Sequence, residues 1–296
     1  MNGRGFFSRA AIAFGFFAAA SFGSALASEA TALKDPSRIA SIGGSVTEII
    51  YALGEQDKLA ARDSTSVYPE QALKLPNVGY MRQLSPEGVL SVNPTGIIAL
   101  HGSGPKEAVE VLKKASIPYV EIPEKFDHQG ILTKIRAVGR ALGQDAKADS
   151  LAKEIDAQLT SAEASTAKVK ERKRVLFILS MQGGKILAAG GDTAADGIIK
   201  LSGAINAMKG FTGYKQLSDE AAVAAKPDVV LMMTRGGGHG VADEELFAHP
   251  AIAPTPAGLN KKVIRMDGSY LLGFGPRTAG AIHDLAVALY ADQVAP

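Results

Sequence analysis

The chain has 296 residues, of which 46% are hydrophobic and 21% charged, a balance typical of globular proteins and not of disordered ones. Lysine and arginine total 32 against 30 acidic residues, so the net charge of +2 lacks the basic surplus of nucleic-acid-binding proteins. The absence of cysteine from the sequence excludes disulfides, thiolate nucleophiles, zinc–cysteine sites and iron–sulfur clusters.

Residues 1–27 have the layout of a secretory signal peptide. Arg4 and Arg9 precede an apolar run from Ala10 to Ala20, and the segment ends in Ala25-Leu26-Ala27. The run is shorter than the ~20 residues that a transmembrane helix needs, which makes an uncleaved anchor the weaker alternative. We therefore expect a cleaved leader and a periplasmic product without stable membrane insertion.

Short apolar runs alternate with helical patterns along the rest of the chain, which predicts an α/β fold with mostly parallel sheets flanked by helices. The expected strands are Ile39–Ile42, Gly96–Leu100 and Pro118–Ile122 in the first half, and Arg174–Leu179, Asp228–Met233 and Lys262–Met266 in the second. A last helix is expected after Pro276. The two halves are assigned as lobes, residues 36–127 and residues 173–292.

The two halves share a repeated pattern. Leu84-Ser85-Pro86-Glu87 leads to Pro94 and an apolar strand, and Leu217-Ser218-Asp219-Glu220 leads to Pro227 and another. The offset is 133 residues at the leucines, the glutamates and the prolines. A constant offset over a helix, a turn and a strand favours two lobes of related topology over chance similarity.

Residues 128–172 differ from both halves, because apolar residues recur there at the helical spacings of three and four. They include Ile131, Ile135, Val138, Leu142, Leu151, Ile155 and Leu159. No proline interrupts the segment, so we expect a long rigid interlobe helix rather than a flexible linker. A ligand would then bind in a cleft between the lobes, beyond the carboxyl ends of the strands.

The common enzyme signatures are missing from the sequence. It contains no G-x-S-x-G motif, no G-x-x-x-x-G-K-[ST] phosphate loop and no H-E-x-x-H motif. The five histidines include no pair at helical ligand spacing, which argues against a preformed multi-histidine metal site. His101-Gly102-Ser103-Gly104 is interpreted as a strand-to-helix turn.

The segment Asn77–Arg82, Asn-Val-Gly-Tyr-Met-Arg, is predicted to be a loop at the edge of the first lobe. Gly79 frees the backbone just before Tyr80, so the phenol can point into the cleft. Phenolate oxygen suits ferric iron, and tyrosine is an axial ligand of haem. Phenols ionise near pH ~10, and both ferric iron and a nearby arginine, Arg82 or Arg235, favour the phenolate. The alternative for Tyr80 is a surface tyrosine packed on its own loop.

These motifs resemble the periplasmic haem-binding proteins of bacterial haem ABC importers. The resemblance rests on Asn77–Glu87, Asp192–Asp196 and Gly273–Arg277, and it extends over essentially the whole chain after the leader. It implies a carrier, not an enzyme, that captures ferric haem with Tyr80 as the axial iron ligand. It also implies that Arg235 supports the tyrosinate from the opposite lobe, and that an inner-membrane ABC permease with its ATPase receives the haem.

One departure from the family concerns the second axial position. Some relatives supply a histidine where this chain has Ser180-Met181-Gln182-Gly183-Gly184, so five-coordinate ferric haem on Tyr80 is expected. Met181 is a candidate haem contact, although a neutral thioether is a poor partner for ferric iron opposite phenolate and core packing is the competing interpretation. The candidate partners of the haem propionates are Arg82, Lys185 and Arg62.

Glu87 and Glu220 occupy matching positions in the two lobes, each two residues after a serine that can cap a helix. Their simplest role is to favour the helix start electrostatically. The resemblance implies a second role, in which one acidic side chain per lobe docks onto arginines of the permease.

We expect the protein to be a monomer with no nucleic-acid partner.

Two alternatives remain open at this point. The same fold could bind a ferric siderophore, cobalamin or a bare metal ion, although a siderophore site would want clustered aromatics and only 6% of residues are aromatic. A bare metal site would want several histidines and carboxylates. The second alternative is an exported α/β enzyme, which would need a nucleophile with a paired base or two opposed carboxylates.

Overall fold

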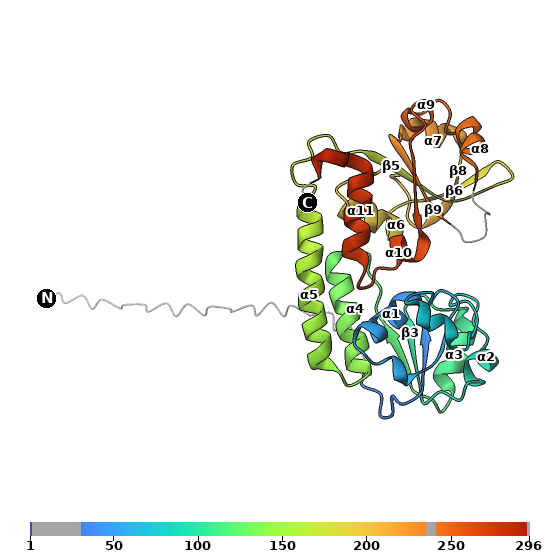
Figure 1. Cartoon of the computed structure of the whole chain (residues 1–296), viewed down its shortest axis with the longest axis vertical. Helices are drawn as coiled ribbons and strands as arrows, with labels where there is room; N and C mark the ends of the chain where they lie inside the picture. The colour runs from blue at the N-terminus through green and yellow to red at the C-terminus, as the bar shows by residue number, and fades with distance from the viewer. Residues whose placement is uncertain (2–30, 235–240, 295–296) are drawn as a thin grey trace.

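The structure, a computed structural model, describes residues 31–234 and 241–294 together with Met1. The rest of the expected leader, the last two residues and Arg235, which is expected to support the tyrosinate, therefore lie outside the described residues. Two α/β lobes lie one above the other and are joined along one side by a pair of helices (Figure 1). No helix in the described ranges is both long and apolar enough to cross a bilayer.

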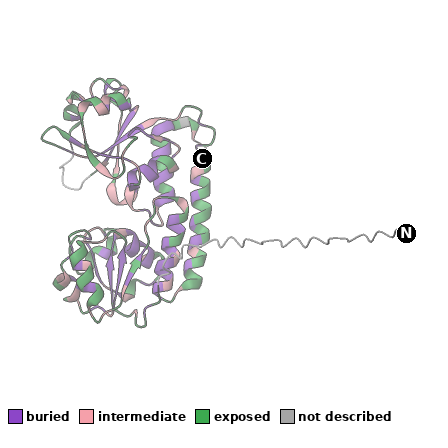
Figure 2. Ribbon diagram, turned by 180° about the vertical axis from the view of Figure 1, so that it is seen from behind, coloured by how far each residue is buried: buried purple, intermediate pink, exposed green. Residues whose placement is uncertain are grey.

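The first lobe is built on a parallel four-stranded sheet in the order β2-β1-β3-β4. Its strands are β1 Ile39–Ile42, β2 Leu59–Arg62, β3 Gly96–Leu100 and β4 Tyr119–Ile122. Its helices are α1 Gly44–Ala52, α2 Pro86–Leu90 and α3 Lys106–Lys114, with the 3-10 turns η1 Gln56–Lys58 and η2 Glu70–Lys74. The central strands β1 and β3 are buried throughout, because helices cover both faces of the sheet (Figure 2).

The second lobe contains a mixed sheet in the order β10-β9-β5-β6-β8, with β7 also paired to β5. Its strands are β5 Arg174–Gln182, β6 Lys185–Ala189, β7 Ile205–Asn206, β8 Tyr214–Leu217, β9 Val229–Thr234 and β10 Val263–Asp267. Its helices are α6 Ala194–Leu201, α7 Asp219–Ala225, α8 Asp243–Ala248, α9 Pro256–Leu259, α10 Gly268–Leu272 and α11 Thr278–Tyr290, followed by η3 Ala291–Gln293. The predicted two-lobed α/β architecture is thus confirmed.

Two of the five strand pairings in the second sheet are antiparallel, which the sequence pattern did not indicate. The strand expected to end at Leu179 continues to Gln182 and turns back through Gly183 and Gly184, whose φ values are 57° and 72°. Glycine adopts these left-handed conformations without the steric cost that a side chain imposes. The hairpin places β6 antiparallel to both β5 and β8, while β10, β9 and β5 run parallel.

The repeated pattern corresponds to equivalent elements of the two lobes. α2 and α7 begin 133 residues apart, and so do β3 and β9. The Ser85 hydroxyl accepts the Gly88 N–H at 3.2 Å, and the Ser218 hydroxyl accepts the Ala221 N–H at 3.3 Å. The two serines therefore cap the two helices in the same way, as the shared pattern predicted.

The connector contains two antiparallel helices, α4 His128–Ala141 and α5 Asp145–Ala164, which lie side by side (Figure 1). Gly143, at a φ of 68°, ends the first helix in the left-handed conformation common just after a helix. The 20-residue α5 is the predicted interlobe helix, and it packs against α11 of the second lobe while α4 packs against α1 of the first. The sequence analysis predicted one long helix here, because residues at helical spacing continue on both sides of the turn at Gly143.

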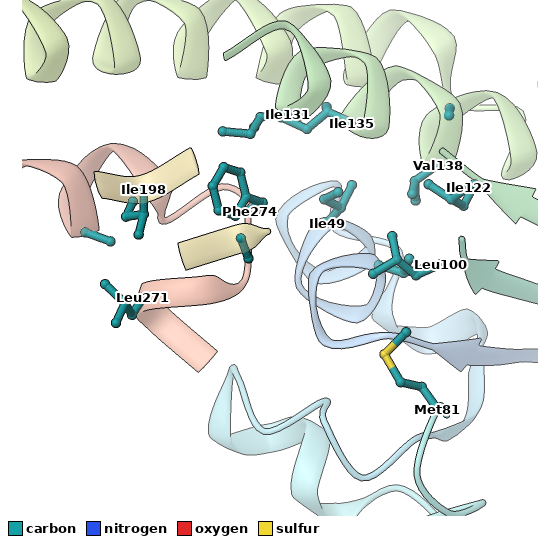
Figure 3. Packing of buried hydrophobic residues seen from close by; sticks show 14 of the residues in the cluster. Ile49, Met81, Leu100, Ile122, Ile131, Ile135, Val138, Ile198, Leu271 and Phe274 are labelled. Carbon is teal, nitrogen blue, oxygen red and sulfur yellow. The ribbon is translucent and has the colours of Figure 1, made fainter. Parts of the chain in front are cut away.

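An apolar cluster runs without interruption from the first sheet through the connector into the second lobe. At its centre the ring of Phe274 is fully buried and meets the edge of Phe126 at a centroid distance of 5.2 Å. Figure 3 shows Phe274 lying between Ile198 of α6 and Ile49 of α1, beside Ile131 of α4. Because such interiors are close-packed, this contact holds the two lobes at a defined angle.

Candidate functional site

The carboxyl ends of the first-lobe strands face the second lobe. The loops after β2, β3 and β4 are residues 63–68, 101–104 and 123–125, and the segment 79–82 is hydrogen-bonded to the first of them through Ser64 and Gly79; these four segments are called here the interlobe loops. Contacts across the lobes start at this edge: Glu48, in the helix that follows β1, pairs with Arg277 of the second lobe, and Phe126 packs against Phe274. The sheet therefore presents its loops where ligands bind in open α/β folds.

Tyr80 lies on one of the interlobe loops, and its backbone is fixed on both sides. Gly79 has a φ of 102°, its N–H donates to the Asn77 side chain at 3.0 Å, and its carbonyl accepts the Ser64 N–H at 2.8 Å. The Tyr80 carbonyl accepts the Gln83 N–H at 2.8 Å. The side chain is 40% exposed, and its hydroxyl has no hydrogen-bond partner within the described residues. The phenol oxygen is therefore available to a ligand.

The residues after Tyr80 tie the loop to the next strand connection. Met81 is buried, its carbonyl accepts the Gly104 N–H at 2.9 Å, and the Gly104 carbonyl accepts the Leu84 N–H at 2.8 Å. Gly104 belongs to the turn that begins at His101, so this turn serves as a strand-to-helix connection that supports the tyrosine loop.

Arg82 is exposed on the same loop and lies within electrostatic reach of both lobes. Burial raises the pKa of Tyr214, at the start of β8 in the second lobe, and the Arg82 guanidinium acts in the opposite direction. Burial likewise raises the pKa of Glu124, against the attraction of Lys134 and, more weakly, of Arg82. Arg82 therefore adds positive charge to the region between the lobes, close to Tyr80 in sequence.

A second group of side chains joins the lobes directly. The Arg277 guanidinium donates to the buried Glu48 carboxylate at 2.9 and 3.0 Å, and the Arg277 backbone N–H adds a bond of 3.1 Å. The same guanidinium lies 3.6 Å from the ring centroid of Tyr68 and 5.4 Å from that of Tyr270. Burial, together with the hydrogen bond from its hydroxyl to Asp284, raises the pKa of Tyr270 to about 12.

A buried ion pair lies beside this group. Lys134 of α4 has no exposed surface, and its ammonium is 2.6 Å from the Glu124 carboxylate in the loop after β4. It also donates to the Phe274 carbonyl at 2.9 Å and to the Ser45 hydroxyl at 3.3 Å. Burial lowers the pKa of Lys134, and its attraction to Glu124 acts against that effect. One side chain of the connector thus contacts both lobes.

The other residues singled out in the sequence are distributed as follows. Met181 is buried on β5 in the second apolar cluster, so the core interpretation fits its position. Arg62 is also buried, and its guanidinium donates to the Ala72 carbonyl at 3.1 Å and the Asp63 carbonyl at 3.0 Å. Lys185 is exposed at the β5–β6 hairpin. Of the three propionate candidates, Arg82 and Lys185 thus keep exposed charges.

Glu87 and Glu220 are both exposed in the first turns of α2 and α7. A hydrogen bond from the Ser85 hydroxyl, at 2.8 Å, lowers the pKa of Glu87. The pKa of Glu220 is lowered because its carboxylate accepts hydrogen bonds from its own backbone N–H and from the Ser218 side chain. Each lobe therefore presents one ionised carboxylate at an equivalent exposed position.

Sequence reasoning assigned no role to Glu48, Tyr68, Lys134 or Arg277. Lys134 offered one signal, because a lysine between Ile131 and Ile135 falls on the apolar side of its helix. Among the described residues no group of three His, Asp or Glu side chains could hold a metal ion. Two surface hollows of about 470 and 430 Å³ lie at the α1–α5 contact and beside α6, away from the interlobe loops.

Comparison with known proteins places the fold. The family model described as periplasmic binding protein matches residues 39–270. The solved structure of the periplasmic haem-binding protein RhuT from Roseiflexus sp. RS-1, in apo form, is 37% identical in sequence, with a TM-score of 0.82 over 86% of this chain and 98% of that chain. This agreement covers both lobes and the connector.

Two curated relatives extend the comparison. An uncharacterised ABC transporter substrate-binding lipoprotein of Bacillus subtilis (strain 168), YvrC, is 27% identical over 267 residues, 89% of this chain and 83% of the relative. A vitamin B12-binding protein of Vibrio parahaemolyticus is 24% identical over 246 residues, 83% of this chain and 86% of the relative. The named relatives are thus binding proteins, and RhuT and the Vibrio protein bind different ligands, haem and vitamin B12.

Proposed function

This chain belongs to the periplasmic binding protein family, and we propose that it captures ferric haem between its lobes through Tyr80. It is a substrate-binding protein of an ABC importer and not an enzyme. The importer's permease and ATPase are its partners, and delivery of haem to them completes the proposed role. The proposed leader, residues 1–27, would bring the protein to the periplasm.

The observation that carries the haem proposal is the Tyr80 phenol. It is 40% exposed on a rigidly held loop at the carboxyl ends of the first sheet, and no described side chain uses its oxygen. Phenolate is a hard anionic ligand that binds ferric iron well, whereas neither a siderophore nor cobalamin requires a protein phenolate. The similarity to RhuT, a periplasmic haem-binding protein, supports the same ligand class.

Arg82 supports the proposal electrostatically. A guanidinium near the iron-bound oxygen favours the phenolate, and the same charge can instead meet a haem propionate at the edge of the site. Arg235, outside the described residues, is proposed to approach the tyrosinate from the second lobe. Haem bound in this way needs no chemical step, and the packed interlobe contact at Phe274 restricts the site to small movements between capture and release.

An absorbance titration tests the ligand assignment. Purified apo-protein is titrated with ferric haem and, separately, with cyanocobalamin and a ferric catecholate siderophore. We expect a saturable spectrum with the charge-transfer band of tyrosinate-bound ferric haem, and no saturable change with the other two. Saturable binding of cyanocobalamin without any binding of haem would replace this proposal with a cobalamin carrier.

Glu87 and Glu220 are proposed to dock the loaded protein onto arginines of the permease. We expect the double variant Glu87→Arg, Glu220→Arg to lower haem-stimulated ATP hydrolysis by the reconstituted importer about tenfold or more, because like charges then face each other at both contact points. Its affinity for haem should match that of the unmodified protein, since both side chains are exposed in the first turns of their helices, outside the interlobe loops.

A matched control uses acidic residues from the first turns of other helices. Glu107 of α3 and Glu244 of α8 are exposed, one in each lobe, and carry the same charge. The variant Glu107→Arg, Glu244→Arg should retain ATPase stimulation. Equal losses in the two double variants would show that net charge, and not the proposed contact points, governs docking.

A further inference from the structure

Four exposed apolar or aromatic side chains are gathered in one short segment of the first lobe. Among the described residues after Met1, seven large hydrophobic side chains are exposed, and four of them lie between positions 67 and 80: Val67, Tyr68, Leu73 and Tyr80. Burying such side chains normally stabilises a protein, so their concentration beside the interlobe loops indicates a surface that a ligand covers.

Tyr68 stands out because one face of its ring is already occupied from the other lobe. The Arg277 guanidinium lies 3.6 Å from the ring centroid, the geometry of a close cation–π contact. Arg277 is itself fixed by the buried Glu48 carboxylate. The ring is thus held at the boundary of the lobes, yet 44% of the residue remains exposed.

Tyr68 and Tyr80 belong to the same end of the first sheet. Tyr68 follows β2 by six residues, and Tyr80 follows Gly79, whose carbonyl accepts the N–H of Ser64 in the loop after β2. The two tyrosines therefore project from hydrogen-bonded neighbouring segments. The Tyr80 hydroxyl has no hydrogen-bond partner among the described residues, and much of the Tyr68 ring remains exposed.

From this arrangement we propose that Tyr68 is a second ligand-contacting residue, whose ring packs against the flat macrocycle of the bound porphyrin. The inference rests on the proposed haem function and adds a contact with the macrocycle to the bond at the iron. Offset aromatic stacking and the burial of apolar surface supply the attraction. Because Arg277 and Glu48 hold the ring in place beforehand, little side-chain freedom is lost when the porphyrin binds.

The two tyrosines should respond differently to the metal. A bond to iron contributes nothing to the binding of metal-free protoporphyrin IX, whereas packing on the macrocycle contributes to the binding of both ligands. Tyr68→Ala is therefore expected to weaken binding of ferric haem and of metal-free protoporphyrin IX by about tenfold each. The tyrosinate charge-transfer band should persist in this variant, and Tyr68→Phe, which keeps the ring, should bind both ligands within about twofold of the unmodified protein.

Fluorescence and absorbance titrations of the full exported protein measure both affinities, with Val111→Ala as the control for truncating an exposed apolar side chain on α3. Unchanged affinities in Tyr68→Ala would overturn the proposal. Loss of the charge-transfer band in Tyr68→Phe would also overturn it, because the hydroxyl would then be an iron ligand. Failure of the unmodified protein to bind haem would instead refute the proposed function itself, so the two failures are distinguishable.

Discussion

Tyr80→Phe is expected to abolish the charge-transfer band of the haem complex and to weaken ferric haem binding by at least about 100-fold. Residues that only support a metal ligand contribute about 10–100-fold to affinity, and loss of the ligand itself should cost no less. The substitution removes a single oxygen and keeps the ring. The loop should keep its conformation, because the hydrogen bonds of Gly79 and of the Tyr80 carbonyl are made by the backbone.

Titration of the variant with ferric haem and with metal-free protoporphyrin IX provides the measurement. The metal-free porphyrin should bind Tyr80→Phe as it binds the unmodified protein, since it has no iron to bond. Tyr51→Phe, on the partly buried end of α1, is the matched control and should change neither titration. A variant at position 80 that keeps the band would show that another group coordinates the iron.

Lys134→Met is expected to lower the free energy of unfolding of the apo-protein by about 3–5 kcal/mol. The substitution nearly preserves the volume of the side chain but leaves the Glu124 carboxylate, 11% exposed, without its counter-charge at 2.6 Å. It also removes the donor to the Phe274 carbonyl, at the point where the second lobe meets the connector. A buried charge or carbonyl that loses its partner costs more than the intact pair contributes.

Urea unfolding followed by circular dichroism measures this effect. The double variant Lys134→Met, Glu124→Gln should recover part of the loss, because no unpaired charge then remains buried. Lys153→Met, an exposed lysine of α5, should stay within about 0.5 kcal/mol of the unmodified protein. A loss below about 1 kcal/mol in the single variant would show that the Glu124 carboxylate is neutral or hydrated without Lys134.

The strands that the sequence predicted best are those with the strongest local signals. β1 and β3 match the predicted limits, because each is a short, fully buried and mainly apolar run next to turn-forming residues. β8, with the sequence Tyr-Lys-Gln-Leu, has no such pattern and was not predicted. It is a strand because its backbone pairs with β6, and this pairing exists only in the folded lobe.

The same distinction holds for the candidate site. The glycine before Tyr80 and the serine caps before Glu87 and Glu220 are local features, so the sequence alone drew attention to the loop and to the two helix starts. The Glu48–Arg277 pair joins residues 229 positions apart, and Lys134 reaches a carbonyl 140 positions away. No local pattern marks such partners, because their proximity arises only when the lobes pack together.

The sequence by itself, through its hydrophobic periodicity and short motifs, determined the α/β class, the helical connector between two similar lobes and Tyr80 as the candidate ligand. Those properties depend on each residue's near neighbours, which the order of amino acids specifies directly. Tertiary packing decided the burial of the Lys134–Glu124 pair, the position of the Tyr68 ring at the lobe boundary and the fixed arrangement of the lobes. Only the folded chain brings such distant residues into contact and excludes water from them.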